Sequence, residues 1–139
     1  MSQPPPANPS RLHELPGQEC LRLLAYRSYV GHIGFSLEGR PMILPVNYLF
    51  DEGVVIFRTS ERSLLSGLEG RLVAFEVDDN TPLDSAGWSV LVHGTVERIT
   101  DGTWLERMRR GPLRSWAWRR AELFFRIPIE SITGRTIGE

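Results

Sequence analysis

The stretch HIGFSLEGRPMILPVNYLFDEGVVIFRT, from His32 to Thr59, decides the fold, because it contains three extended segments separated by two tight turns. The first turn lies at EGR, where Gly39 can adopt the positive φ that a tight hairpin requires. The second lies at DEG, residues 51–53, directly before the apolar run VVIFRT. Three hairpin-linked strands in succession predict an antiparallel meander.

Further strands are predicted downstream of this meander. The alternation in RLVAFEVDD, residues 71–79, indicates a fourth strand, and WSVLVHGTVERIT, residues 88–100, a long fifth one. Gly94 within the fifth strand suggests a bulge or bend of the kind that lets a sheet curl into a barrel. ELFFRIPIESITGRTI, residues 122–137, supplies a last strand and has room for a hairpin. We therefore expect a mainly β fold, a small six-stranded closed barrel with short peripheral helices.

Two segments beside these strands have helical character. LPGQECLRLLAYRSYVG, residues 15–31, places Pro16 near a first helical turn and its leucines on one side. GTWLERMRRG, residues 102–111, indicates a second short helix, which Gly111 and Pro112 end.

The composition is that of one ordinary globular domain. A length of 139 residues with 41% hydrophobic side chains fits a single domain, placed at residues 12–139 after a Pro-rich tail at 1–11 that we expect to be disordered. The net charge of -1 gives no general attraction to nucleic acid or to a membrane surface. Because the chain has no lysine, any anion site must use arginine, hydroxyls or backbone amides.

The sequence also constrains the cellular compartment. Cys20 is the only cysteine, which excludes an intramolecular disulfide and makes a reducing cytoplasm the natural setting. No apolar run approaches the roughly 20 residues that span a bilayer, and MSQPPPANPS at the start lacks the apolar centre of a signal peptide. We expect a cytoplasmic protein.

The stretch that follows the third strand raises a question of function. In VVIFRTSERSLLSGLEG, residues 54–70, an apolar strand is followed by arginines and hydroxyls before helical spacing begins. If Ser60 caps a helix over residues 62–69, the free amides of its first turn form a seat for an anion. Four further side chains could hold the anion: Arg58, Thr59, Arg62 and Ser63. A capped helix with solvated arginines explains the same residues, and helix caps are the commoner feature.

Four pieces of the sequence, taken in order and at their spacing, resemble one known family. They are GRPMILPVNY, VVIFRT, FEVDD and GWSVLVHG, and the likeness runs from about Leu15 to Ile137. The family is the pyridoxamine 5'-phosphate oxidase-like family of flavin-binding split barrels. The resemblance implies a split β-barrel homodimer that binds flavin mononucleotide (FMN) in clefts between the two chains and acts on a small-molecule substrate.

The same resemblance implies which residues hold the cofactor. The strand that matches LPVNY lies along the isoalloxazine ring, and the match to FRT with its following turn holds the phosphate. The residues implied are Pro45, Val46 and Asn47 for the ring, Arg58, Thr59, Arg62 and Ser63 for the phosphate, and Trp88 and Ser89 for a segment near the ring or ribose. The flavin would carry the redox chemistry, which explains why no acid–base motif is visible in the sequence.

One position departs from the family pattern. Relatives often continue the phosphate turn with a glycine, a small hydroxyl residue and a lysine, whereas this chain has Arg62, Ser63 and Leu64. Some relatives bind the deazaflavin coenzyme F-420, with its anionic tail, in place of FMN. Two alternatives to an FMN-dependent oxidoreductase therefore stay open: a deazaflavin-dependent reductase, and a non-catalytic protein that binds flavin or haem.

An arginine cluster is a candidate for binding such a tail. ERMRRGPLRSWAWRR, residues 106–120, surrounds Trp116 and Trp118 with arginines from Arg107 to Arg120, and arginine with interleaved aromatics can bind an anionic chain. A solvated helix face, followed by tryptophans that cover the barrel, is the commoner explanation.

The histidines offer little further chemistry. His32 and His93 lie in predicted strands, where a lone histidine is more often a packed, hydrogen-bonded residue than a catalyst. His93 shares a strand with Trp88 and is the better candidate for a catalytic residue. We recognise no metal motif, because the histidines form no helical i, i+4 pair.

Overall fold

The predicted meander forms the centre of the fold. The computed structural model describes residues 12–26, 30–81, 83, 86–110 and 122–138, and the tail predicted at 1–11 lies outside them. Strands β2 (Val30–Leu37), β3 (Arg40–Asp51) and β4 (Val54–Ser60) pair in antiparallel order.

Both turns of the meander contain two consecutive residues with positive φ. Glu38 and Gly39 have φ values of 50° and 79°, and Glu52 and Gly53 have values of 46° and 83°. Two left-handed residues in a row form the hairpin turn whose twist matches that of the flanking strands. The predicted role of Gly39 is confirmed.

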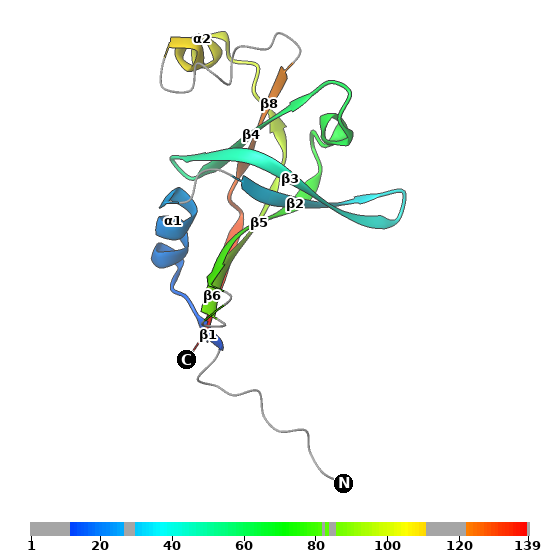
Figure 1. Ribbon diagram of the computed structural model, residues 1–139. Coiled ribbons are helices and arrows are strands. Elements are labelled where there is room, and N and C mark those ends of the chain that lie inside the picture. The colour runs from blue at the N-terminus through cyan, green and yellow to red at the C-terminus, as the bar shows by residue number, and fades with distance from the viewer. Residues whose placement is uncertain (1–11, 27–29, 82, 84–85, 111–121, 139) are drawn as a thin grey trace.

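All strands belong to one curled antiparallel sheet. The remaining strands are β1 (Leu12–Glu14), β5 (Leu72–Thr81), β6 (Ala86–Thr95), β7 (Glu97–Arg98), β8 (Glu122–Pro128) and β9 (Ser131–Ile137). Their order in the sheet is β1-β9-β6-β5-β2-β3-β4-β8-β7, and the sheet curls on itself (Figure 1). The expectation of a mainly β split barrel is confirmed.

The predicted number of six strands is wrong, since the sheet has nine strands within the described residues. The predicted fifth strand is divided at Val96, whose N–H donates to the Arg71 carbonyl and whose carbonyl accepts from the Gly70 N–H. Beyond this point β7 pairs with β8. The predicted last strand is divided at Ile129 and Glu130, between β8, which pairs with β4, and β9, which pairs with β6. The sequence pattern also gave no sign of β1, which pairs with β9.

Glycine is required at position 94 because another strand approaches the backbone closely there, and not because β6 has a bulge. Gly94 pairs in regular register with Val73 on β5. A Cβ atom at this position would lie 2.3 Å from the carbonyl oxygen of Pro128 and 2.6 Å from a methyl group of Ile127. The end of β8 therefore packs directly on β6, which lets the two halves of the curled sheet meet.

Both predicted flanking helices are present. They are α1 (Gly17–Tyr26) and α2 (Gly102–Arg110). Asp101 starts α2, because its carboxylate accepts a hydrogen bond of 2.9 Å from the Thr103 N–H. No helix within the described residues is long and apolar enough to cross a membrane.

The prediction of a helix after β4 is wrong in the length of the helix and in its capping residue. In place of a helix over residues 62–69 capped by Ser60, the chain forms one 3-10 turn, η1 (Leu64–Gly67), capped by Ser63. Leu65 and Leu68 are both buried in the core. Their spacing of three residues matches the three residues per turn of a 3-10 helix, which explains the tighter turn.

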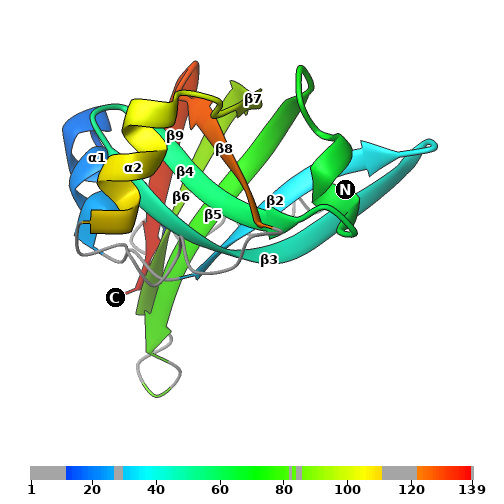
Figure 2. The same ribbon diagram turned by 90° about the horizontal axis from the view of Figure 1, so that it is seen from above.

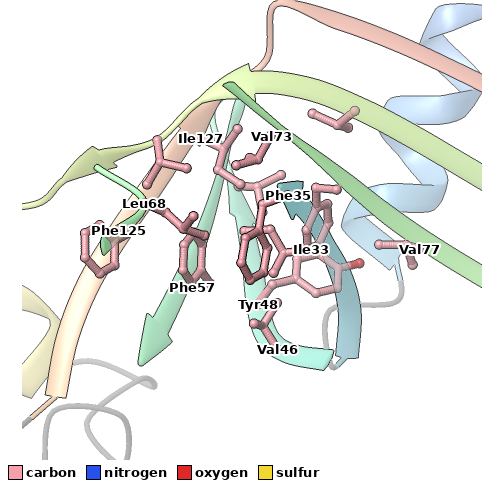
Figure 3. Packing of buried hydrophobic residues seen from close by; sticks show 14 of the residues in the cluster. Ile33, Phe35, Val46, Tyr48, Phe57, Leu68, Val73, Val77, Phe125 and Ile127 are labelled. Carbon is pink, nitrogen blue, oxygen red and sulfur yellow. The ribbon is translucent and has the colours of Figure 1, made fainter. Parts of the chain in front are cut away.

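Aromatic side chains fill the inside of the curled sheet (Figure 3). Tyr48 and Phe75 meet edge to face with ring centroids 4.9 Å apart, and Phe57 stacks on Phe125 at 5.5 Å. Cys20 on α1 joins this core as a buried residue, and burial raises the pKa of its thiol. Figure 2 shows α1 and the tip of the β2–β3 hairpin on opposite sides of the molecule.

A second, smaller core lies on the other side of the sheet. It joins α2 to β4 and β8 through Ile56, Ile99, Met108 and Phe124. We call this side, which points away from the aromatic core, the outer face. α2 covers its β4 and β8 part, whereas Val30 and Ile43 on β2 and β3 keep exposed fractions of 51% and 72%.

Candidate functional site

Two predicted cofactor residues lie side by side on the outer face. The β3–β4 pairing ends at Tyr48 and Phe57, and Asn47 and Arg58 are the residues that follow this last pair on the two strands. Both side chains point outward, because residues alternate between the two sides of a sheet and Tyr48 and Phe57 point into the core. Asn47 is exposed and Arg58 is half-buried.

The same cross-strand row continues to a third predicted residue. Asn47 pairs with Val30 on β2, and Ser89 on β6 pairs with Asp78 on β5. The antiparallel pairing of β2 with β5 runs from Gly34 to His32, and Val30 and Asp78 each lie two residues beyond its last pair, His32 with Glu76. We call the five residues Arg58, Asn47, Val30, Asp78 and Ser89 the Arg58 row. They come from five consecutive strands of the sheet, and their side chains lie on its outer face.

The residues predicted for the isoalloxazine ring divide between the two sides of β3. Pro45 and Asn47 are exposed on the outer face, while Val46 keeps only 6% of its surface exposed and packs in the core. A ligand on the outer face would therefore meet the side chains of Pro45 and Asn47 and only the backbone of Val46.

The residues predicted to bind the phosphate also differ in the direction and exposure of their side chains. Arg58 points outward, but Thr59 is buried, with 8% exposed. Arg62 is exposed in the turn after β4. The Ser63 hydroxyl already accepts a hydrogen bond of 3.1 Å from the Leu65 N–H as the cap of η1. The two arginines are thus the predicted phosphate residues whose side chains are neither buried nor the cap of η1.

Trp88 and Ser89 lie on opposite sides of β6. Ser89 belongs to the Arg58 row, whereas Trp88 is half-buried against the aromatic core. Trp88 also lines an open cavity of about 410 Å³ at the end of the β5–β6 hairpin, together with His13, Asp79 and Thr136. The structure therefore does not bring Trp88 together with Asn47 and Arg58 within one chain.

The catalytic candidate His93 is exposed on the outer face. Its Nδ1 lies 3.4 Å from the Ser131 hydroxyl on β9. It is four residues along β6 from Ser89, on the same side of the strand.

Sequence reasoning missed a cluster of titratable side chains on this face. His32 on β2 pairs with Glu76 on β5, and His32 Nδ1 lies 3.5 Å from a Glu76 carboxylate oxygen. Burial, followed by a hydrogen bond and the negative charge of Asp78, raises the pKa of Glu76 to about 7. The cluster joins two strands about forty residues apart in sequence, which a search for spacing along one segment cannot detect.

The arginine cluster of residues 106–120 lies only partly within the described residues. Arg107 lines a cavity of about 270 Å³ between α2 and the β3–β4 turn, beside Trp104, Asp51 and Arg126. Arg110 pairs with Glu106 at 3.1 Å. The other members of this prediction, Arg114, Trp116, Trp118, Arg119 and Arg120, are outside the described residues, as is the side chain of Arg109.

Known proteins share both the sequence and the fold. The uncharacterized protein Rv0080 of Mycobacterium tuberculosis is 33% identical over 135 residues, which cover 93% of this chain and 88% of that protein. The FAD binding protein of Mycobacterium smegmatis has a TM-score of 0.73 at 29% identity, with 91% of this chain and 98% of that chain covered. A conserved protein of unknown function from Corynebacterium diphtheriae has a TM-score of 0.74 at 27% identity, with 91% and 98% covered.

The family assignment rests on most of the chain. Residues 16–136 match the family described as pyridoxamine 5'-phosphate oxidase, a span that includes every predicted cofactor residue. Flavin-binding proteins with this fold stand among the structural relatives. The chain belongs to the pyridoxamine 5'-phosphate oxidase-like family.

Proposed function

We propose that this protein is a flavin-dependent oxidoreductase that acts on a small-molecule substrate. The observation that carries the proposal is the Arg58 row, in which a guanidinium group stands next to an exposed amide and an exposed apolar side chain. Such a surface suits a planar ring with an anionic tail, because the ring can lie on apolar and backbone atoms while arginine pairs with the phosphate.

Residues of β3 and β4 would hold the cofactor. Pro45 and Asn47 would contact the ring from the outer face, and Arg58 with Arg62 would pair with the phosphate in place of the lysine that relatives often have after this turn. A bound flavin supplies hydride or electron transfer, while the protein contributes binding, orientation and electrostatics.

The row also supports a homodimer with the cofactor between two chains. Arg58 on β4 and Ser89 on β6 are separated along the curled sheet by β3, β2 and β5, a path of about 19 Å at roughly 4.8 Å per strand spacing, so we infer that they serve different parts of the cofactor site. In a dimer, the Ser89 side chain and the backbone of Trp88 can serve the flavin whose phosphate is held by Arg58 of the other chain. The exposed Val30 and Ile43 would then be covered at the interface.

FMN is the first flavin to test and FAD the second. FMN is the cofactor that the family resemblance implies, whereas the similar Mycobacterium smegmatis protein binds FAD. Both contain the same ring and ribityl phosphate, so the Arg58 row would serve either. The deazaflavin coenzyme remains the alternative that the missing lysine suggests.

The test is a fluorescence titration of the cofactor-free chain with FMN, FAD and the deazaflavin coenzyme, each in separate experiments. We expect tight binding of a flavin, and a 10- to 100-fold weaker affinity in Arg58→Ala, because a charged hydrogen bond contributes about 1.5–3 kcal/mol. The matched control is Arg98→Ala, an exposed arginine on β7 outside the row. Thermal unfolding of both variants verifies that they are folded.

Three outcomes would contradict parts of the proposal. If only the deazaflavin coenzyme binds, the proposed cofactor is wrong, but the proposal of a reductase still stands. An equal loss of affinity in both arginine variants would remove Arg58 from the site. Tight flavin binding without reduction by nicotinamide donors, and without transfer to small acceptors, would favour a flavin-binding protein that performs no turnover.

A further inference from the structure

We propose that His32, Glu76 and Asp78 form a binding site for one divalent transition-metal ion on the outer face of β2 and β5. One ligand atom from each of the three side chains lies within 4.8 Å of the other two. The site shares Asp78 with the Arg58 row, but its three ligand atoms come from His32, Glu76 and Asp78 alone, so metal binding can be tested without flavin.

The sheet itself brings the three ligands together. Glu76 and Asp78 are two residues apart on β5, so that both side chains leave the same side of the strand. His32 is the cross-strand partner of Glu76, and paired side chains on one face of a sheet are neighbours. The convergence is therefore fixed by backbone pairing and does not depend on a flexible loop.

The distances suit metal coordination. Bonds of about 2.0–2.2 Å from zinc to nitrogen and oxygen place neighbouring ligand atoms roughly 3–3.5 Å apart. His32 Nδ1 and the nearer Glu76 oxygen are already separated by 3.5 Å. Asp78 is exposed, and a rotation of its side chain can close the remaining gap.

The charges in the cluster favour a cation. Two carboxylates adjoin a histidine that can act as a neutral ligand, and no arginine among the described residues forms an ion pair with Glu76 or Asp78. Asp78 pairs with Ser89 on β6, and Ser89 pairs with Arg135 on β9, so Arg135 lies two strands away from Asp78. The Glu76 side chain keeps only 32% of its surface exposed, which strengthens the repulsion between the carboxylates that a divalent ion would relieve.

The ligand set selects the kind of metal. Imidazole favours zinc and its neighbours in the first transition row, whereas magnesium and calcium prefer sites made of oxygen alone. Three protein ligands also leave at least one coordination position for water or another small ligand, as in catalytic zinc sites. Zn²⁺ is therefore the probe that we would use, with Mg²⁺ as the comparison.

The experiment is a calorimetric titration of the chelator-treated, full-length protein with zinc chloride. We expect one Zn²⁺ per chain and at least a tenfold loss of affinity in each of His32→Gln, Glu76→Gln and Asp78→Asn. Two controls remove the same side-chain types elsewhere, His13→Gln on β1 and Glu69→Gln after η1. Both should bind Zn²⁺ as the parent protein does.

A second measurement keeps the test valid if a variant is unstable. Zn²⁺ should raise the melting temperature of the parent and of the controls but not of the three ligand variants, and Co²⁺ should give a visible absorption band only where the site is intact. Absence of Zn²⁺ binding, equal binding by all variants, or Mg²⁺ binding as tight as that of Zn²⁺ would each overturn the proposal. Failure of flavin binding in the titration above would leave these results unaffected.

Discussion

The phenol of Tyr48 on β3 donates a hydrogen bond of 2.8 Å to the carbonyl oxygen of Leu24 on α1. Both residues are fully buried. The next residue back along β3, Asn47, points to the outer face and belongs to the Arg58 row. One strand therefore anchors α1 on its inner side and presents the candidate cofactor surface on its outer side, which makes the position of that surface depend on the core.

We expect Tyr48→Phe to lower the free energy of unfolding by about 1–2 kcal/mol, because the buried carbonyl of Leu24 loses its phenol donor. Urea denaturation followed by tryptophan fluorescence measures the change. Tyr26→Phe is the control, since Tyr26 is 73% exposed. A change below about 0.5 kcal/mol in Tyr48→Phe would mean that another donor, such as water, replaces the phenol.

Stability should also fall at high pH because of Tyr48. Burial raises the pKa of its phenol from 10 to about 12. The folded state thus holds this proton more tightly than the unfolded state, so the contribution is fully present below pH 10 and is lost as the pH rises from 10 to 12. Urea denaturation at pH 9, 10 and 11 should show this fall in the parent protein and a smaller one in Tyr48→Phe. Identical pH profiles would contradict the assignment.

Gly94→Ala should destabilise the protein by about 2 kcal/mol or more, because the added Cβ would lie 2.3 Å from the backbone oxygen of Pro128. Backbone atoms cannot move away as a flexible side chain can. Gly67→Ala is the matched control, since a Cβ there meets nothing within 4 Å. Equal melting temperatures for the two variants would show that β6 and β8 separate easily.

The proposed homodimer predicts a specific effect of Ile43→Asp. Ile43 is 72% exposed on the outer face, and a buried carboxylate at an interface is costly. Light scattering coupled to gel filtration should give a dimer for the parent and a monomer for this variant. Leu83→Asp, in which the replaced leucine is 97% exposed in the β5–β6 connection, should stay dimeric. A monomeric parent protein would refute the dimer directly.

Local patterns predicted those parts of the fold that local chemistry controls. The turn at Gly39 needs a positive φ, and the segment GTWLERMRRG has helical character of its own, so both could be located from the sequence. The division of the long strand at Val96 could not, because it is caused by hydrogen bonds to Gly70 and Arg71 from a distant part of the chain. Tertiary contacts of this kind leave no periodic signal in the strand itself.

The candidate site was predictable only in part for the same reason. Arg58 and Asn47 could be selected from the family resemblance, but their adjacency follows from the pairing of β3 with β4. That pairing also explains why Thr59, one residue further, points into the core. The cluster of His32 with Glu76 depends on a register between β2 and β5 that no motif in either strand encodes.

At Ile129 and Glu130 the chain crosses from one half of the sheet to the other, and this crossing has a consequence for folding during synthesis. Residues 122–137 supply β8 and β9, which pair with β4 and β6 and so complete both halves of the sheet. A ribosome that has synthesised the chain only as far as α2 has released strands whose edges still lack these neighbours. Such edges can pair with other chains, so we expect the nascent protein to be prone to aggregation until residues 122–137 emerge.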